Sequence, residues 1–272
     1  MGLEEEDLVT FQDIVAEPQG ALLSISLNRP EALNALTARL RQELLQALRD
    51  ADRNPELRVV VIRGHGRAFS VGQDLKEMTE YYEAHGTRLG KLVQDEYIPI
   101  VQALRNLSKP TVAVLEGAAV GGGMALALAA DFRVISTRAQ MVPGFVNVGL
   151  APDTGTAFLL GRSIGYARAL SVCLTGQPIK AAQLVEWGLA ASAHDSAESL
   201  NEELAQLTDK LSHGPTKAYA VIRRLFDQSA HLPLEAVLGL ERDAQEELAQ
   251  TQDHQSSIAA FLAKQTPEFH GQ

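Results

Sequence analysis

The first half of the chain alternates between segments with the two-residue period of a strand and segments with the helical period. In residues 21–27, leucine and isoleucine share one face while serines occupy the other, which predicts a half-buried strand. The period becomes helical over 37–53, and Thr37 is a residue type that caps helix N-termini. The runs at 58–63 and 111–115 are apolar without alternation, which is typical of strands buried on both faces.

Further elements continue this alternation as far as Pro152. The pattern predicts helices at 76–82, 89–107 (bent at Pro99) and 124–130, and short strands at 132–136 and 140–142. Strands that alternate with helices favour an α/β domain with a largely parallel sheet.

After Pro152 the pattern becomes mostly helical. It predicts helices at about 154–161, 166–174, 180–187, 197–211, 216–230, 234–249 and 254–264, with an extended segment at 189–193. We therefore divide the chain into an α/β core at 1–200 and a helical region at 201–272. That region packs either on the core or on a neighbouring subunit.

Composition and charge exclude several classes of protein. The 272 residues carry a net charge of −10, which argues against a broad nucleic-acid surface but not against a small anionic ligand. The acidic N-terminus has no signal-peptide pattern, and Glu116, Asp131 and glycines interrupt the longest apolar stretch. The single cysteine, Cys173, permits no internal disulfide and reads as a buried structural thiol. We expect a cytoplasmic protein without a membrane segment.

Two glycine-containing turns follow buried strands, at 64–75 and 116–125. Glycine lets the backbone approach a ligand closely, and N–H groups at a helix start are unpaired. Two such turns side by side could present two donors to one oxygen, as in an oxyanion hole. The alternative is that they are tight turns and helix-packing glycines. The first turn has Phe69 where a third glycine belongs, so it does not match a dinucleotide-binding fingerprint.

Other chemistry finds weaker support. The seven histidines form no metal-binding spacing, so we expect no metal site. Ser70 lacks a nucleophile motif and an evident base. Asp74 is expected to cap a helix, and Asp153 could do so after Pro152. Glu116 has no evident mechanistic role.

Six segments of the chain, in order, resemble the crotonase superfamily, the enoyl-CoA hydratase/isomerase family. They are LNRPEALNAL (27–36), AFSVGQDLKEM (68–78), KPTVA (109–113), GAAVGGG (117–123), DFR (131–133) and GLAPD (149–153). The resemblance implies a ClpP-like spiral of ββα units and a helical C-terminal region that forms trimers, often paired as hexamers. It also implies an acyl-coenzyme A thioester as substrate, with no prosthetic group, and the pattern is closest to the isomerases of phenylacetate degradation.

The resemblance also implies roles for individual residues. The oxyanion donors would be the backbone N–H groups of Gln73 and Gly122. The coenzyme would meet Arg29, Val71, Leu75 and Lys76, and the neighbouring subunit's coenzyme would meet Phe261 and Lys264. The last two residues could equally belong to an ordinary amphipathic helix. The acyl pocket would be lined by Ala125, Phe145 and Val146.

The two glutamates that hydratases of this family use are absent, because Ala125 and Phe145 occupy their positions. Asp153 occupies a position where isomerases of this family carry an acid, and one carboxylate can move a proton between two carbons. We therefore expect an isomerase that shifts a double bond or rearranges a ring thioester. The alternatives are an enoyl-CoA hydratase and a non-catalytic acyl-CoA-binding oligomer.

Overall fold

The structure, a computed structural model, describes residues 11–272. The prediction that the chain has no signal peptide concerns the N-terminal segment, which lies outside these residues. No helix within 11–272 combines the length and the apolar character needed to span a bilayer.

A six-stranded sheet forms one layer of the core. Its order is β1-β2-β3-β5-β7-β10, with β1 and β2 antiparallel and the other neighbours parallel. Its strands are β1 (Ile14–Gln19), β2 (Leu22–Leu27), β3 (Val59–Gly64), β5 (Thr111–Leu115), β7 (Phe132–Ser136) and β10 (Ala193–His194).

A second sheet of four short strands packs beside the first, in the order β4-β6-β8-β9. Its strands are β4 (Ala68–Ser70), β6 (Ala118–Val120), β8 (Gln140–Val142) and β9 (Ile179–Lys180). The pairs β3–β4, β5–β6 and β7–β8 each contribute one strand to each sheet before the chain enters a helical segment. This repetition is the expected spiral of ββα units.

The two faces of the large sheet belong to different apolar clusters. On the inner face, α1 (Ala38–Arg53) packs Leu40, Leu44 and Leu48 into the main core. On the outer face, valines of β3, β5 and β7 contact Leu200 and Leu211 of α9 (Ala197–Ser212). Burial on both faces explains why these central strands lack an alternating pattern. Helix α9 also crosses residue 200, the boundary expected between the two regions.

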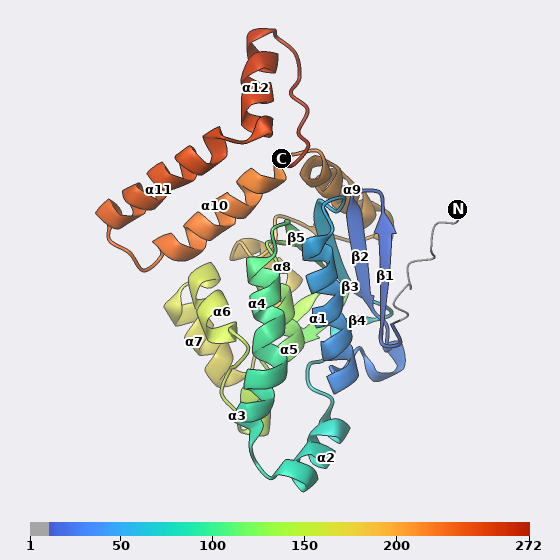
Figure 1. Cartoon of the computed structure of the whole chain (residues 1–272). Coiled ribbons are helices and arrows are strands. Elements are labelled where there is room, and N and C mark those ends of the chain that lie inside the picture. Colours follow the sequence, from blue (N-terminus) through green and yellow to red (C-terminus); the bar gives the residue numbers. More distant parts are fainter. Residues whose placement is uncertain (1–10) are drawn as a thin grey trace.

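The remaining helices surround the core or leave it. Figure 1 shows α11 and α12 projecting away from the two sheets, with α10 beneath α11. The bounds are α2 (Leu75–His85), α3 (Leu89–Leu92), α4 (Ile98–Asn106), α5 (Gly122–Ala129), α6 (Thr156–Ile164), α7 (Tyr166–Thr175), α8 (Ala181–Glu186), α10 (Thr216–Ser229), α11 (Leu234–Ala249) and α12 (Gln252–Leu262).

The structure corrects several element predictions. Strands β1, β4, β6 and β9 were missed, and the last three have only two or three residues each, too few to show a period. The single helix expected at 89–107 is α3 and α4 joined by a π-helical segment, Val93–Tyr97, just before Pro99. Of the extended segment expected at 189–193, only Ala193 lies in a strand, β10, which also includes His194.

Candidate active site

The two glycine-containing turns lie side by side because they follow neighbouring parallel strands. β4 and β6 pair in the second sheet, and the chain leaves each of them toward a helix, α2 and α5. A Cβ added to Gly72 would stand 2.7 Å from the Val120 carbonyl oxygen and 3.2 Å from the Gly122 nitrogen. Gly72 also has φ +82°, a conformation that favours glycine. The close approach of the turns therefore depends on the absence of a side chain at Gly72.

Two backbone N–H groups at this junction have no partner. Among residues 11–272, neither the Gln73 N–H nor the Gly122 N–H donates a hydrogen bond to another protein atom. Gly122 is the first residue of α5, where an unpaired N–H and the positive end of the helix dipole are expected. Both residues line the same pocket. Two free donors in one pocket are the elements of an oxyanion hole.

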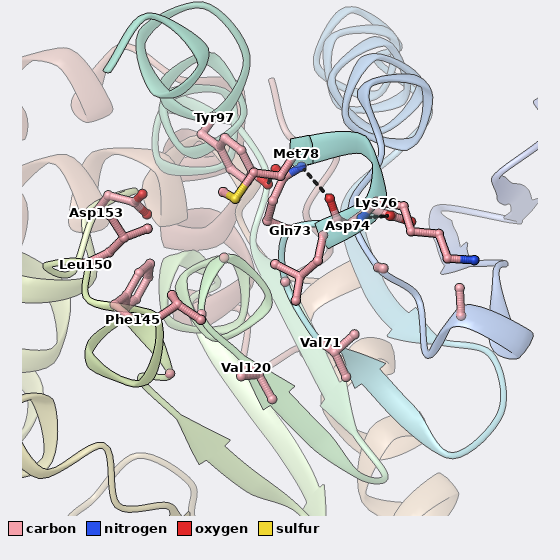
Figure 2. Close-up of a pocket in the computed structure, with 18 of the residues that line it drawn as sticks. Val71, Gln73, Asp74, Lys76, Met78, Tyr97, Val120, Phe145, Leu150 and Asp153 are labelled. Carbon is pink, nitrogen blue, oxygen red and sulfur yellow. Dashed lines mark hydrogen bonds between the residues drawn. The ribbon is translucent and has the colours of Figure 1, made fainter. Parts of the chain in front are cut away.

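The pocket has a volume of about 720 Å³ and runs between α2, α3 with the π-helical segment that follows it, the start of α5 and the segment before α6. Figure 2 shows Phe145, Leu150 and Asp153 on one side of it and Val71, Asp74 and Lys76 on the other. The lining is mostly apolar and also includes Met78, Leu89, Val93, Tyr97, Val120 and Val148. Such a pocket suits an apolar acyl group beside a small polar centre.

Asp153 does not cap a helix. The N-cap of α6 is Gly155, and the Asp153 backbone carbonyl, not its carboxylate, accepts the Thr156 N–H. Within residues 11–272, the carboxylate accepts one hydrogen bond, from Thr154 Oγ1 at 2.6 Å. Asp153 lines the pocket, so its carboxylate is available to a ligand. The helix-cap interpretation of Asp153 is therefore wrong.

Burial raises the pKa of the Asp153 carboxyl above its ordinary value, and the hydrogen bond from Thr154 opposes this rise only in part. A carboxyl group in this environment holds a proton more readily than one in water, which suits a group that takes a proton and gives it back. Thr154 itself has φ +53°, an uncommon conformation for a β-branched residue. Backbone strain of this kind is concentrated at functional sites in proteins.

A buried polar cluster behind the oxyanion turn was missed by sequence reasoning. The Gln73 side-chain oxygen accepts hydrogen bonds from Arg41 Nη1 at 2.9 Å and from the Tyr97 hydroxyl. Arg41 is 1% exposed and also pairs with Glu77 at 2.9 Å and Glu96 at 2.6 Å. The sequence did contain a sign that Arg41 is buried. This residue lies on the inward face of the predicted helix, beside Leu40, Leu44 and Leu48.

At the other end of the pocket, the two cations expected to meet the coenzyme differ in availability. Arg29 Nη1 donates to the Ala35 carbonyl at 2.7 Å and pairs with Asp74 at 3.0 Å, so its charge is already balanced. Asp74 in turn caps α2 by accepting the N–H groups of Lys76 and Glu77, as predicted. Lys76 lines the pocket and is exposed, and its ammonium group forms no ion pair within residues 11–272. Val71 and Leu75 also line the pocket.

Four residues expected at the site lie outside the pocket. Ala125 is fully buried on α5, and Val146 faces the Gly176 backbone at the end of α7, so neither lines the acyl pocket. Phe145, the third expected lining residue, does line it. Phe261 lies in α12 and Lys264 just after it, and both are exposed and away from this chain's own pocket.

Other residues singled out in the sequence have structural roles. Ser70 is buried and donates to the Asn34 carbonyl. Glu116 pairs with Arg63. Cys173 is partly buried against the core, and burial raises the pKa of its thiol. Within the described part of the chain, no group of three or more His, Cys, Asp and Glu side chains could hold a metal ion.

Comparison with known proteins agrees with this geometry. A family model described as enoyl-CoA hydratase/isomerase matches residues 17–272. The 1,2-epoxyphenylacetyl-CoA isomerase of Escherichia coli K12 is 33% identical over 258 residues, covering 95% of this chain and 98% of that protein. The 2,3-dehydroadipyl-CoA hydratase of the same organism is 32% identical over 261 residues, covering 96% of this chain and 100% of that protein.

Among solved structures, the enoyl-CoA hydratase from Polaromonas sp. JS666 superposes with a TM-score of 0.87 at 32% identity, covering 94% of this chain and 99% of that one. A superposition over so much of both chains, together with the family match to residues 17–272, confirms the expected crotonase fold. The similar proteins include both isomerases and hydratases, so the comparisons establish the family and leave the reaction open between the two. The family model matches nearly the whole chain, and the fold and the pocket between the two glycine turns agree with it. This chain therefore belongs to the enoyl-CoA hydratase/isomerase family.

Proposed function

We propose that the protein is an acyl-CoA isomerase that shifts a double bond or rearranges a ring by proton transfer through a thioester enolate. The observation that carries this proposal is the carboxylate of Asp153, which lines the apolar pocket with one hydrogen bond, while Gln73 and Gly122 bring free N–H groups to the same pocket. The other lining carboxylates are engaged or exposed: Asp74 caps α2, and Glu31 lies at the surface.

The reaction balances with these groups alone. Asp153 takes a proton from a carbon activated by the thioester, and the electron pair of the broken C–H bond moves toward the thioester oxygen. The N–H groups of Gln73 and Gly122 stabilise the resulting negative charge, and the loss of one such donor typically costs about 10²–10³ in kcat. Protonated Asp153 then returns the proton to a different carbon. Proton transfer of this kind needs no prosthetic group, and coenzyme A takes part only as the carrier of the acyl group.

The absence of acids at two positions favours isomerisation over hydration. Hydration requires a group that activates water and a second that delivers a proton to the neighbouring carbon. Ala125 is buried and apolar, and Phe145 places an aromatic ring in the pocket wall. Neither residue can hold a water molecule by a hydrogen bond or transfer a proton.

The test is the Asp153→Asn variant, assayed with 3-enoyl, dienoyl and ring-epoxide CoA thioesters. We expect turnover of the substrate that the wild type accepts to fall by at least about 10³, with coenzyme A binding retained, because Asn has the same shape but no basic oxygen. Full activity in this variant would remove Asp153 from the mechanism. Wild-type binding of all three thioesters without turnover would favour a non-catalytic acyl-CoA-binding oligomer instead.

The second candidate is an enoyl-CoA hydratase, and the 32% identity to a 2,3-dehydroadipyl-CoA hydratase supports it. Crotonyl-CoA separates the two activities, because hydration removes the enoyl absorbance. We expect negligible loss of absorbance with the wild type. Rapid loss at ordinary enzyme rates would show that hydration proceeds without acids at Ala125 and Phe145.

We also propose that Lys76 binds a phosphate of the coenzyme, since it is the lining cation that forms no ion pair with residues 11–272. Replacement by alanine should weaken coenzyme A binding roughly fivefold, corresponding to about 1 kcal/mol for an exposed charge-assisted contact. The effect should shrink as salt is added. Arg29→Ala is a poor substitute for this test, because it also leaves Asp74 without its partner.

A further inference from the structure

Gln73, Arg41 and Tyr97 form a cluster behind the first glycine turn, and specific hydrogen bonds as well as packing hold it together. The Gln73 side chain reaches toward α1 and the π-helical segment, where its Oε1 accepts hydrogen bonds from both Arg41 and the Tyr97 hydroxyl. Its Nε2 donates to the Asp74 carbonyl at 3.0 Å. The side chain is therefore anchored through both atoms of its amide. Meanwhile the backbone N–H of the same residue stays unpaired within residues 11–272.

Both donors to Gln73 are themselves held rigidly. Arg41 Nη1 also donates to the Leu36 carbonyl at 2.5 Å, and Leu36, in the segment before α1, forms a parallel β-bridge with Gln73. Glu96, on the π-helical segment, and Glu77, on α2, fix the rest of the guanidinium. Tyr97 is buried, its ring lies under the Arg41 guanidinium, and burial raises the pKa of its phenol despite the nearby Arg41. The hydroxyl therefore keeps its proton and remains a donor to Gln73.

We propose that Tyr97 and Arg41 are positioning residues that hold the Gln73 side chain and thereby aim the Gln73 backbone N–H at the thioester oxygen. The cluster ties α1, α2 and the segment before α4 to one peptide unit of the oxyanion hole. Donors of an oxyanion hole act strongly only when they are already oriented, and a displacement of about 1 Å can cost about a hundredfold in rate. This inference rests on the proposed oxyanion role of Gln73.

Tyr97→Phe and Gln73→Leu test the proposal. Tyr97→Phe removes one hydrogen bond and keeps the ring in the pocket wall, whereas Gln73→Leu removes the acceptor of both. We expect kcat to fall about tenfold in the first variant and up to about a hundredfold in the second, with KM changed less than threefold. Tyr82→Phe is the matched control, because Tyr82 lies outside the pocket and its hydroxyl forms no hydrogen bond within residues 11–272. It should leave kcat unchanged.

A spectroscopic measurement separates this positioning role from a structural one. Cinnamoyl-CoA absorbs at longer wavelength when its thioester carbonyl is polarised, so its red shift on binding reports the oxyanion donors whatever reaction the protein catalyses. We expect a red shift with the wild type and with Tyr82→Phe. The shift should be smaller with Tyr97→Phe and smallest with Gln73→Leu, at equal saturation.

The outcomes are distinguishable. If both variants remain folded, judged by an unchanged melting temperature, and show the full wild-type shift, the positioning role is overturned while the oxyanion hole stands. If the bound wild type produces no shift, the oxyanion hole itself fails and the positioning role fails with it. A reduced shift in Gln73→Leu alone assigns the anchoring to Arg41 and overturns the part given to Tyr97.

Discussion

At the scale of single residues, the surroundings of two aspartates in the same pocket shift their pKa values in opposite directions. Burial with one hydrogen bond raises the pKa of Asp153. Burial acts in the same direction on Asp74, but hydrogen bonds from Arg29 and from the N–H groups of Glu77 and Lys76 outweigh it and lower that pKa. Asp153 is therefore suited to proton transfer, and Asp74 to a fixed structural charge.

The pH dependence of the reaction should follow Asp153. A base must be ionised, so kcat/KM falls as the pH drops through the Asp153 pKa, which burial holds above the ordinary value of an aspartate. The Thr154 hydroxyl stabilises the ionised form, and Thr154→Val removes it while keeping the side-chain shape. We expect the acid limb of the kcat/KM profile to move to higher pH. Thr156→Val is the control, because the buried Thr156 hydroxyl has no hydrogen-bond partner in the described part of the chain. It should leave the limb in place, and an equal movement would contradict the assignment.

Stability provides an independent measure of the same two groups. A carboxyl whose pKa is raised by folding favours the folded state at low pH and loses that contribution as the pH rises through the raised pKa. Asp153→Asn should therefore leave the melting temperature at pH 7 unchanged or higher. Asp74 has a lowered pKa, so its stabilisation is present at neutral pH and lost in acid, and Asp74→Asn should lower the melting temperature at pH 7. Thermal unfolding of both variants at pH 7 and pH 4 checks the two signs, and a lower pH 7 melting temperature for Asp153→Asn would contradict the first.

At the scale of elements, the site depends on two strands of three residues. β4 and β6 pair and stop at the same edge, which brings the Gln73 and Gly122 turns together. The glycines on either side allow the approach: a Cβ on Gly123 would stand 2.5 Å from the Ser70 carbonyl oxygen, and one on Gly72 would meet the other turn. The distance between the turns is thus set by backbone packing.

Gly72→Ala should separate the turns and damage the oxyanion hole. We expect kcat to fall about a hundredfold or more, with a stability loss of at least about 1–2 kcal/mol from the positive φ. Gly20→Ala is the control, because Gly20 has φ +61° in the β1–β2 turn with no atom near its added Cβ. It should lose similar stability and keep its activity. Equal loss of kcat in both variants would show that instability, not the turn distance, is responsible.

At the scale of the whole molecule, the C-terminal helices carry large apolar side chains that this chain leaves uncovered. Phe226, Leu234, Phe261 and Leu262 are all more than two thirds exposed. Monomeric proteins rarely expose apolar surface on this scale. We propose that the protein assembles as a homotrimer, or as a hexamer of two trimers, through these helices, and that Phe261 and Lys264 reach the coenzyme of a neighbouring subunit.

Light scattering coupled to size-exclusion chromatography tests this assembly. We expect a mass three or six times that of the 29.4 kDa chain. Replacing both Phe261 and Leu262 with glutamate should weaken assembly, because charge at the centre of an apolar interface is not compensated. Coenzyme A affinity should fall with it. A wild-type monomer at micromolar concentration would refute the proposal, and a Phe261→Ala variant that keeps its oligomeric state isolates the contact to the coenzyme.

The order of apolar and polar residues along the chain determined most of the elements, because the period of the pattern reflects which face is buried. It also located the two glycine turns, and the resemblance carried by six segments pointed to the family. The sequence left undecided those features of the site that depend on contacts between residues distant in the chain. The sequence around Asp153 does not distinguish a helix cap from a free carboxylate. The structure does, because the N-cap of α6 is Gly155. Arg41, Tyr97 and Gln73 come from three separate segments of the chain, so their cluster exists only when α1 and the π-helical segment before α4 pack together. Strands β4 and β6 are too short to show a period and are held by each other, so tertiary pairing alone decides that the two N–H groups share one pocket.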